Sequence, residues 1–93
     1  MITFLLRCQV ADFDTWRPQY EESTAATPEV LSYRLFRGTD DTNLVVLIET
    51  FESREVAEAL LNAPGLQDEM AAHGVDVSSL TLDFLNDVAA MNR

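Results

Sequence analysis

The chain contains the stretch Leu44-Val45-Val46-Leu47-Ile48-Glu49-Thr50-Phe51, in which five apolar residues precede the first charged one. A strand that is apolar on both faces is typical of the centre of a sheet that is covered on both sides. The turn cluster Gly38-Thr39-Asp40-Asp41-Thr42-Asn43 precedes this stretch, and residues 30–37 before the turn are rich in β-formers. Residues 30–37 and 44–51 are therefore predicted to form a β-hairpin.

Before this hairpin, the sequence predicts one strand and one helix. Residues 2–10 form an apolar run that we interpret as a strand. Asp12 or Asp14 then caps a helix, because either side chain can accept hydrogen bonds from a first turn. With Asp14 as the cap, Pro18 falls in the first turn, where its missing N–H does little harm. The helix should end before Pro28, and its apolar face is formed by Phe13, Trp16, Tyr20 and Thr24.

After the hairpin, the sequence predicts an interrupted helix and a last strand. Ser53 is predicted to cap a helix, which Pro64-Gly65 interrupts. A second helical piece follows, and Gly74 suits its C-terminal end because glycine adopts left-handed angles readily. Residues 80–88 alternate between apolar and polar side chains, which indicates a strand with one face buried.

The predicted order is strand, helix, strand, strand, helix, strand. This order is the split βαβ pattern of ferredoxin-like α+β folds. We therefore expect a four-stranded antiparallel sheet with helices on one face. A length of 93 residues suits one domain, so residues 1–93 are predicted to form a single domain.

The charge of the chain limits its partners. Sixteen acidic residues outnumber six basic ones, which are all arginine, and the formal net charge is −10. A protein that neutralises the phosphates of nucleic acid or of an anionic membrane needs the opposite sign, so neither partner is expected. The acidic surface and the preference for arginine fit either a high-salt habitat or a GC-rich genome.

Three further features of the sequence predict a cytoplasmic location. No apolar run reaches the roughly 18 residues of a membrane span. The first apolar run stops at Arg7 and lacks the charged start of a signal peptide. A single cysteine, Cys8, leaves no internal disulfide and suits a reducing compartment.

The strands can be sorted onto two sheet faces, because alternate side chains point to opposite sides. One face is almost wholly apolar and is expected to lie under the helices: Phe4, Leu6, Cys8, Tyr33, Leu35, Val46, Ile48, Leu82 and Phe84. The opposite face mixes apolar and charged residues: Leu5, Arg7, Ser32, Arg34, Phe36, Val45, Leu47, Glu49, Asp83 and Leu85.

The mixed face is too apolar to be left in water, since exposed apolar patches usually mark interfaces. A second copy of the chain is the simplest cover, so we predict a homodimer whose sheets enclose a space. The candidate ligand-binding residues in that space are Arg7, Arg34, Phe36, Glu49 and Asp83. Their charged members form either a small polar pocket or structural ion pairs at the interface.

Glu49 and Asp83 are the best candidates for acid–base catalysis. A carboxyl group in a closed apolar cavity has a raised pKa, which suits proton transfer. The neighbouring Arg7 and Arg34 would oppose that rise. The sequence contains no glycine-rich phosphate loop, no GxSxG and no HExxH motif. Residues 40–43 fit a hairpin turn better than a calcium loop, so no metal and no cofactor are predicted.

Five other side chains each have a structural and a functional interpretation. Cys8 is either a buried thiol or a nucleophile, which would need a base nearby. Trp16 either packs in the core or lines the mouth of a pocket. Tyr20 and Tyr33 are either core residues or hydrogen-bond donors to a ligand. His73, the only histidine, follows the last helix, where its cation would favour the negative end of the helix dipole.

Two stretches of the sequence resemble the short cyclase-like members of the dimeric α/β barrel superfamily. They are Leu6-Arg7-Cys8-Gln9-Val10-Ala11-Asp12-Phe13-Asp14-Thr15-Trp16-Arg17-Pro18 and Ser32-Tyr33-Arg34-Leu35-Phe36-Arg37. Members of that group open with a strand reading roughly V-R-H-x-V, followed by A-D-Y-D-x-W at the start of a helix. Residues 44–51 and 66–74 match in character, so the resemblance spans nearly the whole chain.

The resemblance implies a βαββαβ fold whose sheets pair face to face in a homodimer. Relatives in the wider superfamily include antibiotic-biosynthesis monooxygenases, polyketide cyclases, haem-degrading enzymes and stress-response barrel proteins. Some of them bind haem through a helical histidine, which is the alternative role for His73. Cys8 stands where a histidine is common, so any chemistry that this histidine carries is not expected here.

Two classes of function follow from these observations. The first is a small organic molecule bound or transformed in the barrel cavity, as in a cofactor-free monooxygenase or a cyclase. The second is a non-catalytic dimeric module with a structural or regulatory role, which the missing catalytic motifs favour. A cavity above roughly 300 Å³ with convergent polar groups would support the first class.

Overall fold

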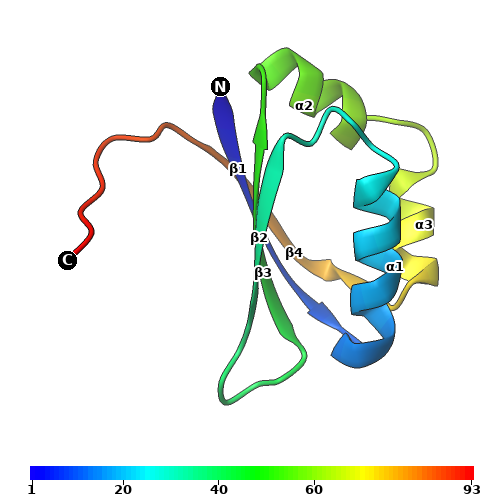
Figure 1. Cartoon of the computed structure of the whole chain (residues 1–93). Coiled ribbons are helices and arrows are strands. Elements are labelled where there is room, and N and C mark those ends of the chain that lie inside the picture. The colour runs from blue at the N-terminus through cyan, green and yellow to red at the C-terminus, as the bar shows by residue number, and fades with distance from the viewer.

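The structure is a computed structural model that describes all 93 residues. It has the βαββαβ order of a ferredoxin-like α+β fold, with the second helix divided in two (Figure 1). The elements are β1 (Ile2–Val10), α1 (Phe13–Ala25), β2 (Ser32–Arg37), β3 (Leu44–Phe51), α2 (Arg54–Leu61), α3 (Leu66–Ala72) and β4 (Val75–Leu85).

The four strands form one antiparallel sheet in the order β2-β3-β1-β4. The apolar strand β3 is central, as its composition predicts. All three helices lie on one side of the sheet, and no element of the chain packs on the other side (Figure 1). We call the first the helix-covered face and the second the open face. No helix is both long and apolar enough to span a membrane.

The ends of the helices follow local signals in the sequence. Asp12 caps α1, and its carboxylate accepts a hydrogen bond from the backbone N–H of Thr15 at 3.2 Å. Pro18 therefore lies in the second turn. The first-turn position was expected with Asp14 as the cap, and that alternative is wrong. Ser53 caps α2 as predicted. Gly74 follows α3 with a φ of 89°, a left-handed angle that glycine adopts without strain.

Strand β4 begins five residues earlier than the alternation over residues 80–88 predicts. The backbone turns at Gly74, and Val75 pairs at once with Val10 of β1. The pairing between these strands is irregular near Gln9, whose backbone N–H donates a hydrogen bond to the hydroxyl of Ser79. This irregularity interrupts the alternation that would have marked the start of the strand. Residues 86–93 lie outside the strand.

The structure corrects the predicted orientation of β3 by one residue. In the pairing with β1, Phe4 lies opposite Glu49, and Leu6 lies opposite Leu47. Partners in register share a face, so Val45, Leu47, Glu49 and Phe51 belong to the helix-covered face. Val46 and Ile48, which were expected under the helices, lie on the open face. The physical reason is that residues 44–48 are all apolar, so their alternation carries no information about orientation.

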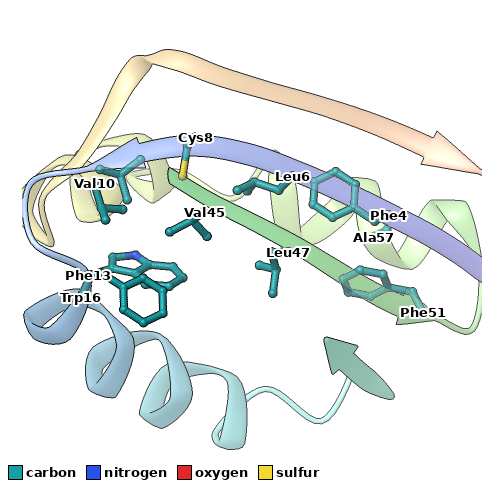
Figure 2. Packing of buried hydrophobic residues seen from close by; sticks show 11 residues of the cluster. Phe4, Leu6, Cys8, Val10, Phe13, Trp16, Val45, Leu47, Phe51 and Ala57 are labelled. Atoms are coloured by element: carbon teal, nitrogen blue, oxygen red, sulfur yellow. The ribbon is translucent and has the colours of Figure 1, made fainter. Parts of the chain in front are cut away.

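The core lies between the sheet and the helices. Eleven side chains are buried, and all of them are apolar or cysteine. Figure 2 shows that side chains from β1 and β3 point toward Phe13 and Trp16 of α1. At the other end of the sheet, the Phe4 ring contacts Phe51 and Phe84, with centroids 6.4 and 5.5 Å away. This packing holds the helices in place beside the sheet.

Candidate functional site

A cavity of about 340 Å³ lies between the helix-covered face and the helices. Its volume falls within the range of small-molecule sites, roughly 300–1,000 Å³. Two-thirds of its lining residues are hydrophobic, 16 of 24. This cavity lies within a single chain, on the opposite side of the sheet from the space predicted between two sheets. Its walls include Trp16 and Tyr20 from α1, Glu49 from β3 and Met70 from α3.

A carboxyl–phenol pair is the main polar feature of this cavity. The hydroxyl of Tyr20 donates a hydrogen bond to Oε2 of Glu49 over 2.7 Å. Burial raises the pKa of Glu49, and the hydrogen bond from Tyr20 opposes that rise. Burial also raises the pKa of Tyr20, so its phenol keeps its proton. A raised pKa makes a carboxyl group better suited to take up a proton from a bound molecule.

An aromatic row on α1 forms one wall of the cavity and orients Tyr20. The rings of Trp16 and Tyr20 are stacked, with centroids 5.1 Å apart and an angle of 17° between their planes. These residues are four positions apart, so they lie above one another on the helix. The Tyr33 ring meets Tyr20 edge-on at 5.4 Å. Tyr20 is thereby held between two aromatic neighbours with its hydroxyl directed at Glu49.

Trp16 and Tyr33 have different surroundings. Trp16 is buried, so it is both a core residue and part of the cavity wall. Tyr33 is not a core residue: 38% of it is exposed, and its hydroxyl lies 3.3 Å from a carboxylate oxygen of Glu21. The structural interpretation therefore holds for Trp16 and not for Tyr33.

Cys8 and His73 also line the cavity. Burial raises the pKa of the Cys8 thiol to about 11, so the thiol stays protonated near neutral pH and is a poor nucleophile. His73 is the residue at which α3 ends, as its position before Gly74 predicts. Its place in the cavity lining is a finding that the sequence did not indicate.

The other predicted site residues lie on the open face. Arg7 and Arg34 are exposed there, as is Asp83, because their cross-strand partners place them opposite the helices. The guanidinium of Arg34 lies 5.1 Å from the centre of the Phe36 ring. The prediction that Glu49 shares this face is wrong, for the reason given for β3. Glu49 and Asp83 are therefore separated by the sheet.

Ion pairs between the predicted charged residues do not form within the chain. The three ion pairs join Arg17 with Glu21, Arg37 with Asp14, and Arg54 with Glu58, and all six side chains are substantially exposed. Exposed pairs of this kind stabilise a protein by at most about 1 kcal/mol. No group of three or more His, Cys, Asp or Glu side chains is placed to hold a metal ion.

The pairing of Tyr20 with Glu49 was missed by the sequence reasoning. The spacing of Trp16 and Tyr20 places both on one helical face, and it leaves Tyr20 either a core residue or a hydrogen-bond donor to a ligand. The partner of Tyr20 lies 29 residues along the chain. A local sequence pattern cannot predict a contact between residues so far apart when the orientation of β3, which carries Glu49, is ambiguous.

Solved structures share this fold at low sequence identity. SnoaB, a cofactor-independent oxygenase of Streptomyces nogalater, has 17% identity and a TM-score of 0.72, over 99% of this chain and 97% of its own. A monooxygenase from the ActVA-Orf6 gene of Streptomyces coelicolor, solved with the ligand nanaomycin D, has 17% identity and a TM-score of 0.69. The match covers 99% of this chain and 91% of that one. Such identities show a common fold.

The family follows from the sequence as a whole. The model of the antibiotic biosynthesis monooxygenase family matches residues 10–72. The chain therefore belongs to the antibiotic biosynthesis monooxygenase family. No curated protein sequence matches it.

Proposed function

We propose that this protein is a cofactor-independent monooxygenase that binds a small organic molecule in the cavity between the sheet and the helices. The observation that carries the proposal is the cavity of about 340 Å³ with Glu49 and Tyr20 joined at its wall. Apolar walls with a few directed polar groups are typical of small-molecule sites. Membership of the family and the cofactor-independent oxygenase activity of SnoaB support the same chemistry.

The proposed reaction balances without a cofactor when the substrate supplies the electrons. One oxygen atom of O₂ enters the product and the other leaves as water, so two hydrogens must come from the substrate. A methylene group oxidised to a carbonyl satisfies this balance: R₂CH₂ + O₂ gives R₂C=O + H₂O. The step requires a base to take the first proton from the activated C–H group. Glu49 is the group in the cavity whose raised pKa suits that transfer.

Tyr20 acts in this proposal as a positioning residue. Its hydroxyl holds Oε2 of Glu49 over 2.7 Å, and the stacked ring of Trp16 holds Tyr20 in turn. A base fixed in this way needs no reorganisation when the substrate arrives.

The experiment measures oxygen uptake with anthrone, a planar ketone with an activated methylene group. We expect one O₂ consumed for each anthraquinone formed, with no added metal or nucleotide. Tyr20→Phe should lower kcat/KM about tenfold, because it removes the hydrogen bond to Glu49. Tyr33→Phe is the matched control and should have little effect, since its hydroxyl lies near Glu21 instead.

We propose further that the functional unit is a homodimer formed through the open face. The apolar residues on that face are Leu5, Phe36, Leu44, Val46, Ile48 and Leu85, and Phe36 and Leu85 are each 40% exposed. Burial of such a patch favours association, and most soluble oligomers are symmetric homodimers. Arg7, Arg34 and Asp83 would then lie at the interface, where they pair across it or contact a ligand. The predicted cytoplasmic location is part of this proposal.

A non-catalytic ligand-binding module is the second candidate function. The inert thiol of Cys8, at a position where the resembling proteins commonly carry a histidine, favours it. A series of ketones with activated methylene groups tests this candidate. If they bind in the cavity and no oxygen is consumed, the non-catalytic function is supported.

A further inference from the structure

Acidic side chains outnumber basic ones in the lining of the cavity. Glu49 and Glu69 belong to the lining, and His73 is the one basic side chain among the 24 residues. All six arginines of the chain lie elsewhere, and the sequence contains no lysine. A buried anion requires a cation or several hydrogen-bond donors to replace its water. The cavity supplies no permanent cation for that purpose.

Glu49 presents one oxygen atom to the cavity. Its Oε2 accepts the hydrogen bond from Tyr20, whereas Oε1 has no partner within the chain. No fully buried side-chain oxygen or nitrogen in the molecule lacks a hydrogen bond, so Oε1 is not fully buried, and Glu49 belongs to the lining of the cavity. A protonated carboxyl group would donate from Oε1 to a carbonyl oxygen of a ligand, and an ionised one would accept from a hydroxyl group.

We infer that the cavity selects uncharged ligands whose carbonyl or hydroxyl oxygen binds at Oε1 of Glu49, and that Glu49 rejects carboxylates of the same shape. The inference rests on the proposed function only in using the same cavity, and it names the class of ligand that enters. It applies equally to a catalytic and to a non-catalytic protein.

Both protonation states of Glu49 disfavour an anionic ligand. When Glu49 is ionised, two negative charges repel each other in a site of low dielectric constant. When Glu49 is protonated, the ligand anion loses its water and gains from Glu49 one uncharged donor, with no permanent cation beside it. An uncharged carbonyl compound of the same shape avoids both costs.

The groups on the neighbouring elements and in the cavity lining support this assignment. Tyr20 from α1 and Tyr33 from β2 are phenols, and the phenol of Tyr20 keeps its proton because burial raises its pKa. Phe4 of β1 lies directly opposite Glu49 and is uncharged. Glu69 and His73 come from the α3 end of the lining, and α2 contributes the apolar Leu60 and Leu61. His73 is the one group whose protonation would favour an anion.

The test compares two naphthalene probes of nearly identical shape by titration calorimetry at pH 8. One is 2-naphthamide, which is uncharged, and the other is 2-naphthoate, which is an anion. We expect the amide to bind at least thirtyfold more tightly than the carboxylate. Glu49→Gln keeps the shape of the side chain and the hydrogen bond to Tyr20 but removes the carboxyl group. It should therefore lower the ratio of amide affinity to carboxylate affinity at least tenfold.

Glu69→Gln is the matched control, because it makes the same chemical change at an exposed position of the lining. It should change the ratio less than threefold. Equal affinity for the two probes, or an equal effect of the two substitutions, would overturn the inference and leave the proposed function standing. If neither probe binds the wild-type protein, the inference and the proposed cavity site both fail. Thermal unfolding of each variant confirms that it is folded.

Discussion

The two faces of the sheet are built from the same strands but differ in burial, in charge and in the elements that cover them. The helix-covered face carries the buried core and contributes one carboxyl group, Glu49, to the wall of the cavity. The open face has no cover within the chain and carries Arg7, Arg34 and Asp83 among apolar side chains. A charge on the open face keeps its water, whereas burial raises the pKa of Glu49. We therefore assign the proposed proton chemistry to the helix-covered face and the proposed association to the open face.

The largest expected effect is a difference in kcat/KM between variants of Glu49 and Asp83, the two carboxyl groups predicted from the sequence as acid–base residues. Glu49→Gln should lower kcat/KM for anthrone about 10²–10⁴-fold, because removal of a general base has effects of that size. Asp83→Asn, the matched substitution across the sheet, should stay within about threefold of the wild type. A larger loss in Asp83→Asn than in Glu49→Gln would reverse the roles that we assign to the two faces.

Adjacent residues of β3 give the next comparison. Leu47 is 3% exposed on the helix-covered face, and Ile48 is its neighbour on the open face. Leu47→Ala should reduce the free energy of unfolding by about 2–4 kcal/mol, since it leaves a cavity in the core. Ile48→Ala should cost about 1 kcal/mol in a monomer and act mainly on association. Chemical denaturation at several protein concentrations distinguishes the two, and equal costs would contradict the observed orientation of β3.

Association is tested on the open face of β2. Phe36→Glu places a charge in the proposed interface and should raise the dimer dissociation constant about 100-fold, as expected for loss of a central aromatic contact. Tyr33→Phe, on the helix-covered side of the same strand, should leave the dimer intact. Light scattering over a range of micromolar concentrations measures both. A wild-type protein that is monomeric throughout that range would refute the proposed dimer.

The smallest expected effect is the dependence of stability on pH. Burial raises the pKa of Glu49 in the folded state above its ordinary value, so the folded state holds this proton more tightly than the unfolded state. The resulting stabilisation is complete below the ordinary glutamate pKa of about 4.3 and is lost as pH rises through the raised value. The difference in unfolding free energy between Glu49→Gln and the wild type should shift in favour of the variant across that window.

Much of the architecture could be predicted because its signals are local. Ser53 and Gly74 mark helix ends through their own side-chain and backbone chemistry, and both predictions are confirmed. The central position of β3 follows from its apolar composition. Strands β1 and β2 have informative alternation, so Arg7 and Arg34 were assigned to the correct face.

The candidate site could not be predicted in the same way, because it depends on one pairing register. Five consecutive apolar residues leave the orientation of β3 open, and only the position of Phe4 opposite Glu49 resolves it. A shift of one residue moves Glu49 from the open face to the cavity. It also brings Oε2 of Glu49 within 2.7 Å of the Tyr20 hydroxyl, a contact between residues 29 positions apart.

The order of the elements and the apolar centre of the sheet were thus readable from the chain alone, since each arises from residues close together in sequence, and the acidic charge follows from composition. Which side of β3 meets the helices was settled when β1 paired with it, because register is a property of two strands and not of one. The same pairing placed the carboxyl group of Glu49 against Tyr20 in the cavity and left Asp83 on the other side of the sheet.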